Sequence, residues 1–139
     1  MRKWIVLGAV ALVVSSLAYR ASQAGAEPET PTIKHVMNKL HKGANSPLSQ
    51  LKGELAAPSP DWEKIQKTTK DFVILGAALA KNDPPKGDKE SWKTLSDHYF
   101  AEAKVLDDAA HAKDQAAAQA AQKKLSASCK ACHTPHKGK

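Results

Sequence analysis

Apolar side chains recur every three or four residues along most of the chain, which is the spacing of one face of an α-helix. The first stripe covers residues 32–42, with Pro31 before it and Gly43 as its stop signal. A short second piece is expected after Ser46, because Pro47 suits the first helical position and leucines follow at helical spacing. The pattern therefore predicts that the folded part begins with a helix and a shorter helical piece.

Longer stripes follow these two pieces. The next predicted helix covers residues 60–79 and can be capped by Ser59. Residues 82–87 form a turn rich in Pro, Asn, Asp and Gly, after which one helix is expected from about Asp88 and a last one from about Ala112. No segment alternates as a strand does. With the two initial pieces counted as one, the pattern predicts an all-α, up-down-up-down four-helix bundle.

The N-terminal segment has the pattern of an export signal. Residues 1–3 are basic apart from the initiator, residues 4–18 are almost entirely apolar, and residues 24–26 offer small side chains for cleavage. The apolar run is short for a membrane helix, which needs about 20 residues. We expect residues 1–26 to be a signal peptide and residues 27–139 to be one exported, periplasmic domain with no membrane attachment. A retained anchor is the alternative.

Composition supports a small helical domain and narrows its function. The chain has 139 residues, of which 24 are Ala and 5% are aromatic, and this composition disfavours an all-β fold. Loss of the signal would lower the formal charge from +7 to +4, because Arg2, Lys3 and Arg20 leave with it. The remaining lysines lie among acids and can steer the protein toward an acidic partner. No aromatic residues are interleaved with the basic ones, so the sequence gives little support to nucleic-acid binding.

The chemistry lies at the C-terminal end, where residues 129–133 read Cys-Lys-Ala-Cys-His. This C-x-x-C-H spacing is the attachment pattern of c-type haem. Two thiols three positions apart on a helical turn can each add to one vinyl group of the porphyrin, and the next residue then presents an imidazole to the iron. The sequence predicts one haem c per chain, held covalently by Cys129 and Cys132, with His133 as the proximal axial ligand.

The same two cysteines are also compatible with three other kinds of site. The two thiols can close a structural disulfide, or they can form a thioredoxin-type redox pair, although no βαβ unit accompanies them. Zinc can recruit Cys129, Cys132, His133 and His136, which would staple a helical bundle without any redox role. The adjacency of Cys132 and His133 makes one tetrahedral centre awkward, so haem remains the favoured prediction.

The exported, Ala-rich chain with a C-terminal C-x-x-C-H resembles the class II c-type cytochromes, the cytochrome c′ group and its low-spin relatives. The turn at residues 86–88, the following Trp92 and the basic Lys137 match the family pattern. The chain departs from it at His136, where the family usually has an aromatic residue, and in having no Arg after Arg20. The resemblance implies the four-helix fold and redox partner proteins, and relatives often form a homodimer through the first two helices, so that both a monomer and a homodimer stay open for this chain. It also implies one of two iron sites: low-spin members carry a first-helix Met on the iron, whereas cytochrome c′ proper leaves the iron open to diatomic gases.

The first helix therefore holds the candidates for the distal iron ligand. Met37 is the only methionine besides Met1, and in an up-down-up-down bundle it lies about 8 Å into its helix, level with His133. His41 follows four residues later on the same face and is the alternative ligand. A third alignment places Leu40 at the distal position of an open site.

The predicted function is that of a monohaem, single-electron carrier, and Trp92 is expected to pack near the porphyrin. The alternative is a five-coordinate haem protein that binds NO or CO. We expect no enzymatic activity, because the sequence has no Ser-His-Asp arrangement, glycine-rich phosphate loop or metal-carboxylate cluster.

Overall fold

The computed structural model describes residues 29–138, and these residues form five α-helices and no β-strand. The helices are α1 (Ile33–Leu40), α2 (Pro47–Ala56), α3 (Trp62–Leu79), α4 (Lys89–His111) and α5 (Gln115–His136). The all-α prediction is confirmed for this part of the chain. None of the described helices is long and apolar enough to span a membrane. The predicted signal peptide, residues 1–26, lies outside the described residues.

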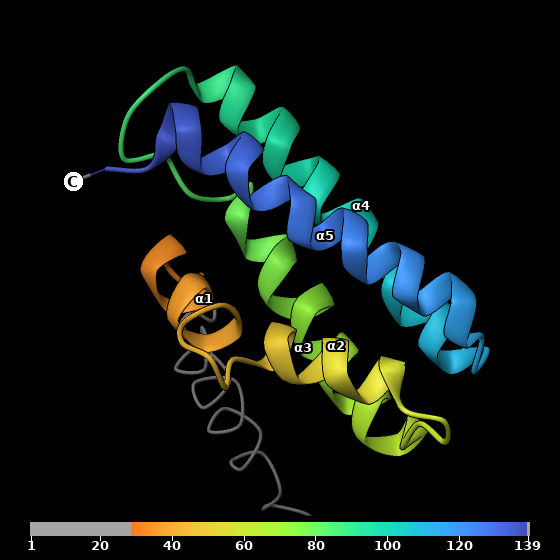
Figure 1. Cartoon of the computed structure of the whole chain (residues 1–139). Helices are drawn as coiled ribbons and strands as arrows, with labels where there is room; N and C mark the ends of the chain where they lie inside the picture. The colour runs from red at the N-terminus through yellow and green to blue at the C-terminus, as the bar shows by residue number, and fades with distance from the viewer. Residues whose placement is uncertain (1–28, 139) are drawn as a thin grey trace, which may run out of the picture.

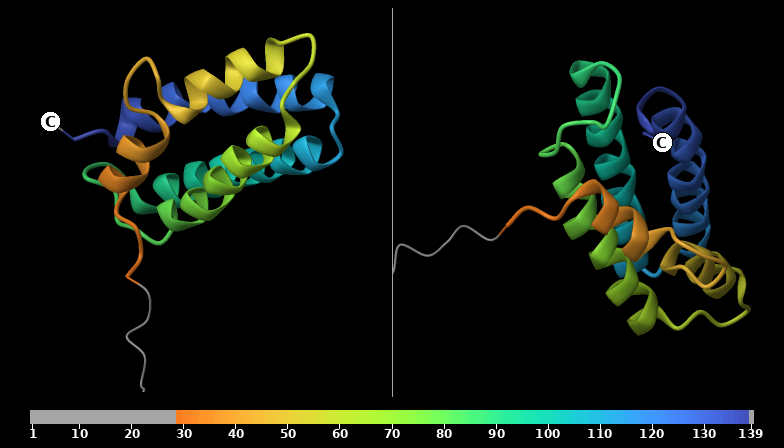
Figure 2. Two further views of the ribbon diagram at one scale, coloured as in Figure 1. Left: turned by 90° about the horizontal axis from the view of Figure 1, so that it is seen from below. Right: turned by 90° about the vertical axis from the view of Figure 1, so that its left-hand side faces the viewer.

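The three long helices form the body of the molecule, and the two short ones cover it. Helix α4 packs extensively against both α3 and α5, and Figure 1 shows α4 and α5 side by side along their length. Helix α2 packs on α5 and α3, whereas α1 packs mainly on α3 (Figure 2). In both figures α1 lies at the end of the molecule where α5 finishes. The first and last helices therefore lie at the same end of the molecule without packing directly on each other.

The two initial pieces form as the sequence predicts. Thr32 and Ser46 are the N-caps of α1 and α2, and each side chain accepts a hydrogen bond from the backbone N–H three residues on, at 3.2 and 3.3 Å. Pro47 occupies the first turn of α2, where its missing N–H costs nothing. Between the helices Gly43 has a φ of +89°, which breaks the helical path.

Two helix boundaries differ from the predictions. Helix α3 is capped by Asp61 instead of Ser59, and the Asp61 carboxylate accepts a hydrogen bond from Lys64 N at 3.1 Å. A carboxylate at this position also interacts favourably with the helix dipole. Helix α5 begins at Gln115 after Asp114, three residues later than predicted, because Lys113 adopts a φ of +56° and turns the chain.

The core is made of side chains from all five helices. Its buried aromatic residues are Phe72, Trp92 and Tyr99, and leucines and alanines in equal number make up most of the rest. Between α4 and α5 the core is lined by alanines, which let the two backbones approach closely. These buried alanines are Ala103, Ala109, Ala110, Ala118 and Ala121.

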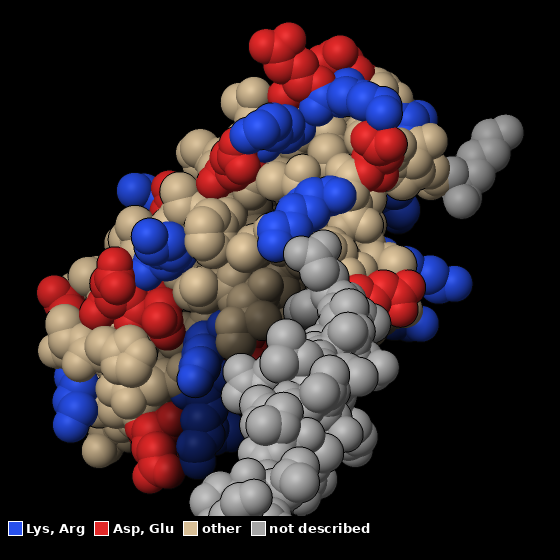
Figure 3. All heavy atoms as spheres, turned by 180° about the vertical axis from the view of Figure 1, so that it is seen from behind, with Lys and Arg blue, Asp and Glu red and all other residues tan. Residues whose placement is uncertain are grey.

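Charged side chains cover much of the outer surface. Figure 3 shows the face behind that of Figure 1, where lysines lie interspersed with Asp and Glu. Exposed ion pairs occur at Lys67–Glu63 and Lys93–Asp97, both one helical turn apart. Such pairs contribute only about 0.3–0.5 kcal/mol each. The apolar core, and not surface pairing, stabilises the fold.

Candidate functional site

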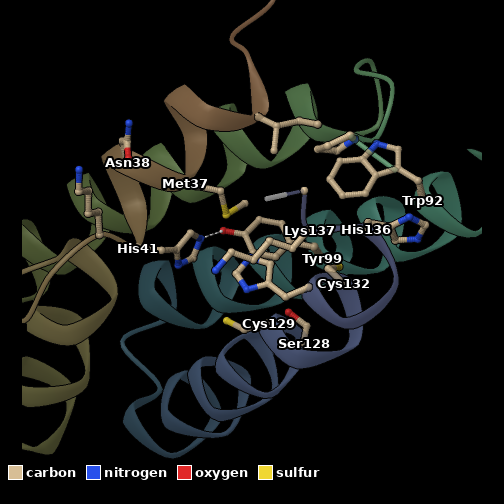
Figure 4. Close-up of a pocket in the computed structure, with 15 residues that line it drawn as sticks. Met37, Asn38, His41, Trp92, Tyr99, Ser128, Cys129, Cys132, His136 and Lys137 are labelled. Carbon is tan, nitrogen blue, oxygen red and sulfur yellow. Dashed lines mark hydrogen bonds between the residues drawn. The ribbon is translucent and has the colours of Figure 1, made fainter. Parts of the chain in front are cut away.

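A cavity of about 330 Å³ lies between α1 and the C-terminal end of α5 (Figure 4). Its lining brings together all the residues that the sequence singled out for haem binding. They are Met37 and His41 on α1, Trp92 on α4, and Cys129, Cys132 and His133 on α5. The lining is mainly apolar, and its volume falls in the range of pockets that hold small organic cofactors.

The cysteine motif sits on the last turns of α5, which continues as a helix to His136. Thr134 Oγ1 donates to the Lys130 carbonyl at 2.8 Å, within this stretch. Cys129 and Cys132 are free thiols, both half-buried, and the helical spacing puts them on the same side of α5. Burial raises the pKa of the Cys132 thiol, and the neighbouring Cys129 raises it further. The two sulfurs are thus presented to one cavity as a pair, without a disulfide between them.

Helix α1 forms the wall of the cavity that faces α5, with Ile33 and Met37. Met37 is half-buried, packs against the core and lines the cavity. His35 is exposed, as the helical spacing predicts. Leu40 is fully buried in the core and does not line the cavity, so the structure gives no support to Leu40 as the side chain above an open iron.

His41 ends α1 and is held by aromatic residues. Its Nε2 lies 2.9 Å from the Tyr99 hydroxyl (Figure 4), and its ring meets those of Phe72 and Tyr99 edge-on, with centroids 5.8 Å apart in each case. Its Nδ1 is buried and has no hydrogen-bond partner among the described residues. Burial, together with the nearby His133, lowers the pKa of His41 to about 4. His41 is therefore neutral at physiological pH, with one ring nitrogen engaged by Tyr99.

Tyr99 is the site residue that the sequence reading missed. It lies in the core and is only 4% exposed, and its hydroxyl also reaches the cavity and His41. Burial raises the pKa of Tyr99, and the neighbouring Cys129 and Cys132 raise it further, so its hydroxyl keeps its proton. The available signal was its spacing: Tyr99 lies seven residues after Trp92, which places both on one face of α4.

His136 is a second residue whose role only the structure reveals. It is 1% exposed, and its Nδ1 lies 3.0 Å from the Lys86 carbonyl oxygen while its Nε2 lies 3.2 Å from Ser91 Oγ. Because the carbonyl can only accept, Nδ1 carries the proton and donates it. The His136 ring also meets Trp92 edge-on, with centroids 5.5 Å apart. His136 thus ties the end of α5 to the α3–α4 connection.

The same connection is tied to the start of α1. The Trp92 indole N–H donates to the carbonyls of Leu79 and Asn82, at 3.1 and 2.8 Å. The Asn82 amide in turn donates to the Pro31 carbonyl at 3.0 Å, just before α1. We call Asn82, Trp92 and His136 the polar latch, because together they fix both walls of the cavity to one loop.

The donor groups of the cavity fit a covalently attached haem better than a zinc ion. Both nitrogens of His136 face protein partners, so the zinc set that includes His136 would have to break the polar latch. Within residues 29–138 no three His, Cys, Asp or Glu side chains are grouped as ligands for a metal ion. Two thiols and an adjacent imidazole beside an apolar cavity are the groups that a c-type haem requires, and the Met37 thioether offers a second ligand for its iron.

Comparisons with protein-family models, with curated proteins and with solved structures found no match to this chain.

Proposed function

We propose that this protein is an exported monohaem c-type cytochrome that carries single electrons between redox partner proteins. The observation that carries the proposal is the shared cavity: the Cys129 and Cys132 thiols, the His133 imidazole and the Met37 thioether line one apolar space. These side chains come from the first and last helices. Their convergence gives the C-x-x-C-H motif a place for a flat, apolar cofactor.

Each residue has a distinct role in this proposal. The two thiols would hold the porphyrin by adding their S–H groups across its two vinyl double bonds, and His133 at the adjacent position would supply the proximal imidazole ligand. The bound haem would supply an iron that changes oxidation state by one electron. Ile33, Trp92 and Tyr99 surround it with apolar surface, which limits water access and favours a small change in structure upon electron transfer.

Met37 is our proposed distal ligand. Among the described residues its side chain makes no hydrogen bond that coordination would break, and it is only partly buried where it packs against the core. His41 is committed to Tyr99 and enclosed by two aromatic rings. Ligation through His41 Nε2 would leave the buried Tyr99 hydroxyl without its partner, which costs about 1–3 kcal/mol. These contacts favour Met37 over His41, and Met ligation implies a higher reduction potential than a bis-His iron.

We also infer the finer topology and the location. The packing of α3 on α4, of α4 on α5 and of α2 on α5 supports an up-down-up-down bundle in which α1 and α2 together represent the first helix. Export to the periplasm is supported by the signal-like pattern of residues 1–26.

The test is to produce the full chain in cells with a haem-maturation system and to record its mass and its visible spectra. We expect one covalently bound haem, sharp reduced bands and no response to CO. The Cys129→Ala/Cys132→Ala variant is expected to carry no covalent haem. Wild-type protein that matures without haem would refute the proposal, whereas broad bands that shift with CO would indicate the gas-binding alternative.

A further inference from the structure

Positive and negative side chains are segregated along the chain. Residues 30–53, which include α1 and most of α2, contain four Lys and no Asp or Glu, whereas Glu54 on the last turn of α2 pairs with Lys64. Residues 115–138, which include α5, likewise contain four Lys and no acid. The intervening residues 54–114 contain nine Lys and twelve acids. We call the first two stretches the basic segments.

The basic segments are the walls of the cavity. Twelve of the fifteen lining residues belong to them, and the other three are Pro85, Trp92 and Tyr99. Two lysines, Lys42 on the α1 side and Lys137 on the α5 side, line the cavity themselves. All eight lysines of the basic segments are exposed. The entrance to the cavity is therefore flanked by positive charge on both sides.

These charges are not neutralised within the described part of the protein. Every described ion pair of a lysine lies in residues 54–114, as in Lys64–Glu54 and Lys89–Asp83. No lysine of the basic segments has such a partner among residues 29–138. Unpaired charges of one sign around a cleft with apolar walls produce a focused field, which raises the local concentration of oppositely charged molecules.

We propose that the mouth of the cavity, flanked by Lys42 and Lys137, is the docking surface for an acidic protein that exchanges electrons with this one. The inference rests on the proposed function, since it assigns the partner of the same site. The acidic face of the partner would be drawn to the end of the molecule that contains the cavity. The mixed surface of α3 and α4 would contribute little to the encounter.

A protein partner is favoured over an anionic membrane surface. Peripheral membrane binding usually combines basic residues with exposed apolar side chains that enter the lipid. The exposed large apolar residues of the described chain are Ile74 on α3 and Val105 on α4, outside the basic segments. The cavity mouth thus carries positive charge that suits an acidic partner, but no exposed large apolar side chain beside it is available to enter a lipid layer.

The first experiment uses two small oxidants of opposite charge. Reduced holoprotein is mixed with ferricyanide or with tris(phenanthroline)cobalt(III) between about 10 and about 150 mM ionic strength, where the Debye length falls from about 30 to about 8 Å. We expect the ferricyanide rate constant to fall by about tenfold or more, and the rate constant for the cobalt complex to rise.

Two charge-reversed variants locate the effect. Lys42→Glu/Lys137→Glu changes the cavity mouth, whereas Lys67→Glu/Lys70→Glu makes the same change of net charge on exposed positions of α3. We expect the first variant to lose or invert the salt dependence with ferricyanide and the second to keep most of it. Equal effects of the two variants would overturn the proposal, because the net charge alone would then explain them.

A second experiment addresses the class of partner. At low salt, poly-L-glutamate is expected to slow the ferricyanide reaction of the wild type and of the α3 variant, but not of the Lys42→Glu/Lys137→Glu variant. If poly-L-glutamate has no effect and the protein instead sediments with phosphatidylglycerol vesicles, the proposal of an acidic protein partner is overturned. Failure of the holoprotein to react with either oxidant would instead refute the electron-carrier function.

Discussion

The Tyr99 hydroxyl lies 2.9 Å from His41 Nε2 and joins the middle of α4 to the end of α1 inside the cavity. His41 is four residues from Met37, so both can reach the same region. Imidazole normally competes well with a thioether for haem iron. The hydrogen bond between Tyr99 and His41 therefore bears directly on which of the two becomes the distal ligand.

Replacement of Tyr99 by Phe is expected to release His41. The Tyr99→Phe variant keeps the aromatic ring and removes the hydroxyl, which lowers the cost of moving His41 by about 1–3 kcal/mol. We expect the weak red absorption band of ferric, Met-ligated haem to diminish and the reduction potential to fall. Potentiometry and absorption spectra measure both.

A double variant separates this effect from general loosening of the cavity. Tyr99→Phe/His41→Leu removes the competing ligand and should recover both the red band and the higher potential. If Tyr99→Phe retains the wild-type spectrum and potential, the hydrogen bond does not control ligation.

Removal of the Met37 thioether is expected to open the iron. The Met37→Ala variant should change from a six-coordinate to a five-coordinate spectrum and should acquire CO binding, because Ile33 has no ligating atom and Tyr99 retains His41. His35→Ala is the matched control, since His35 is exposed on the same helix and should leave the spectrum unchanged. An unaltered Met37→Ala spectrum would eliminate Met37 as a ligand.

The polar latch can be tested through Gly87, which has a φ of +83°. A Cβ at this position would lie 2.8 Å from both His136 Nδ1 and the Pro135 carbonyl oxygen. Gly87→Ala is therefore expected to lower the free energy of unfolding by about 2 kcal/mol or more, through backbone strain and displacement of His136. Thermal unfolding measures the change.

Gly43 provides the control for backbone strain alone. Its φ is +89°, but a Cβ there would have no atom within 4 Å. Gly43→Ala should cost about 1–2 kcal/mol and leave the haem spectrum unchanged, whereas Gly87→Ala should also perturb the spectrum through the end of α5. Equal losses of stability and identical spectra would show that the contact with His136 contributes nothing.

The stability of the haem-free protein should depend on pH through His41. Its pKa is about 4 in the folded state and about 6.5 in the unfolded state. The unfolded chain thus binds more protons between these values, so the contribution of neutral His41 is complete above about pH 6.5 and is lost as the pH falls toward 4. At pH 5 the loss amounts to no more than about 2 kcal/mol.

Urea unfolding at pH 7 and pH 5 measures this dependence in the Cys129→Ala/Cys132→Ala variant. Adding His41→Leu should remove most of the difference between the two pH values. Adding His98→Leu should not, because His98 is exposed. A pH difference that persists without His41 would assign the effect to other groups.

Local signals in the sequence were sufficient for much of the fold. The caps Thr32, Ser46 and Asp88 act on residues three positions away, so their helices begin where the pattern predicts. The turn at Lys113 was not predictable, because no glycine, proline or asparagine marks it and its left-handed φ depends on the packing of α4 against α5. Similarly, Asp61 and Ser59 are both good caps, and the sequence does not choose between them.

The candidate site also contains residues that the sequence predicts and residues that only the fold reveals. Cys129, Cys132 and His133 are recognised because their chemistry depends on spacing within five residues. The contact of Tyr99 with His41 joins residues 58 positions apart, and those of His136 join residues 45 and 50 apart. Such pairs carry no local pattern. Only the fold reveals that one tyrosine faces a histidine and that one histidine of the C-terminal turn is engaged elsewhere.

The placement of the cavity between α1 and α5 also has a consequence for chain entropy. Met37 and His133 are 96 positions apart, so a bridge through one iron atom would close a loop that contains most of the folded chain. A covalent cross-link of that span lowers the conformational entropy of the unfolded chain, which stabilises the folded state by about 4–5 kcal/mol. Bound haem would thus cross-link α1 to α5. Loss of Met37 would then lower the free energy of unfolding of the whole domain as well as change the iron site.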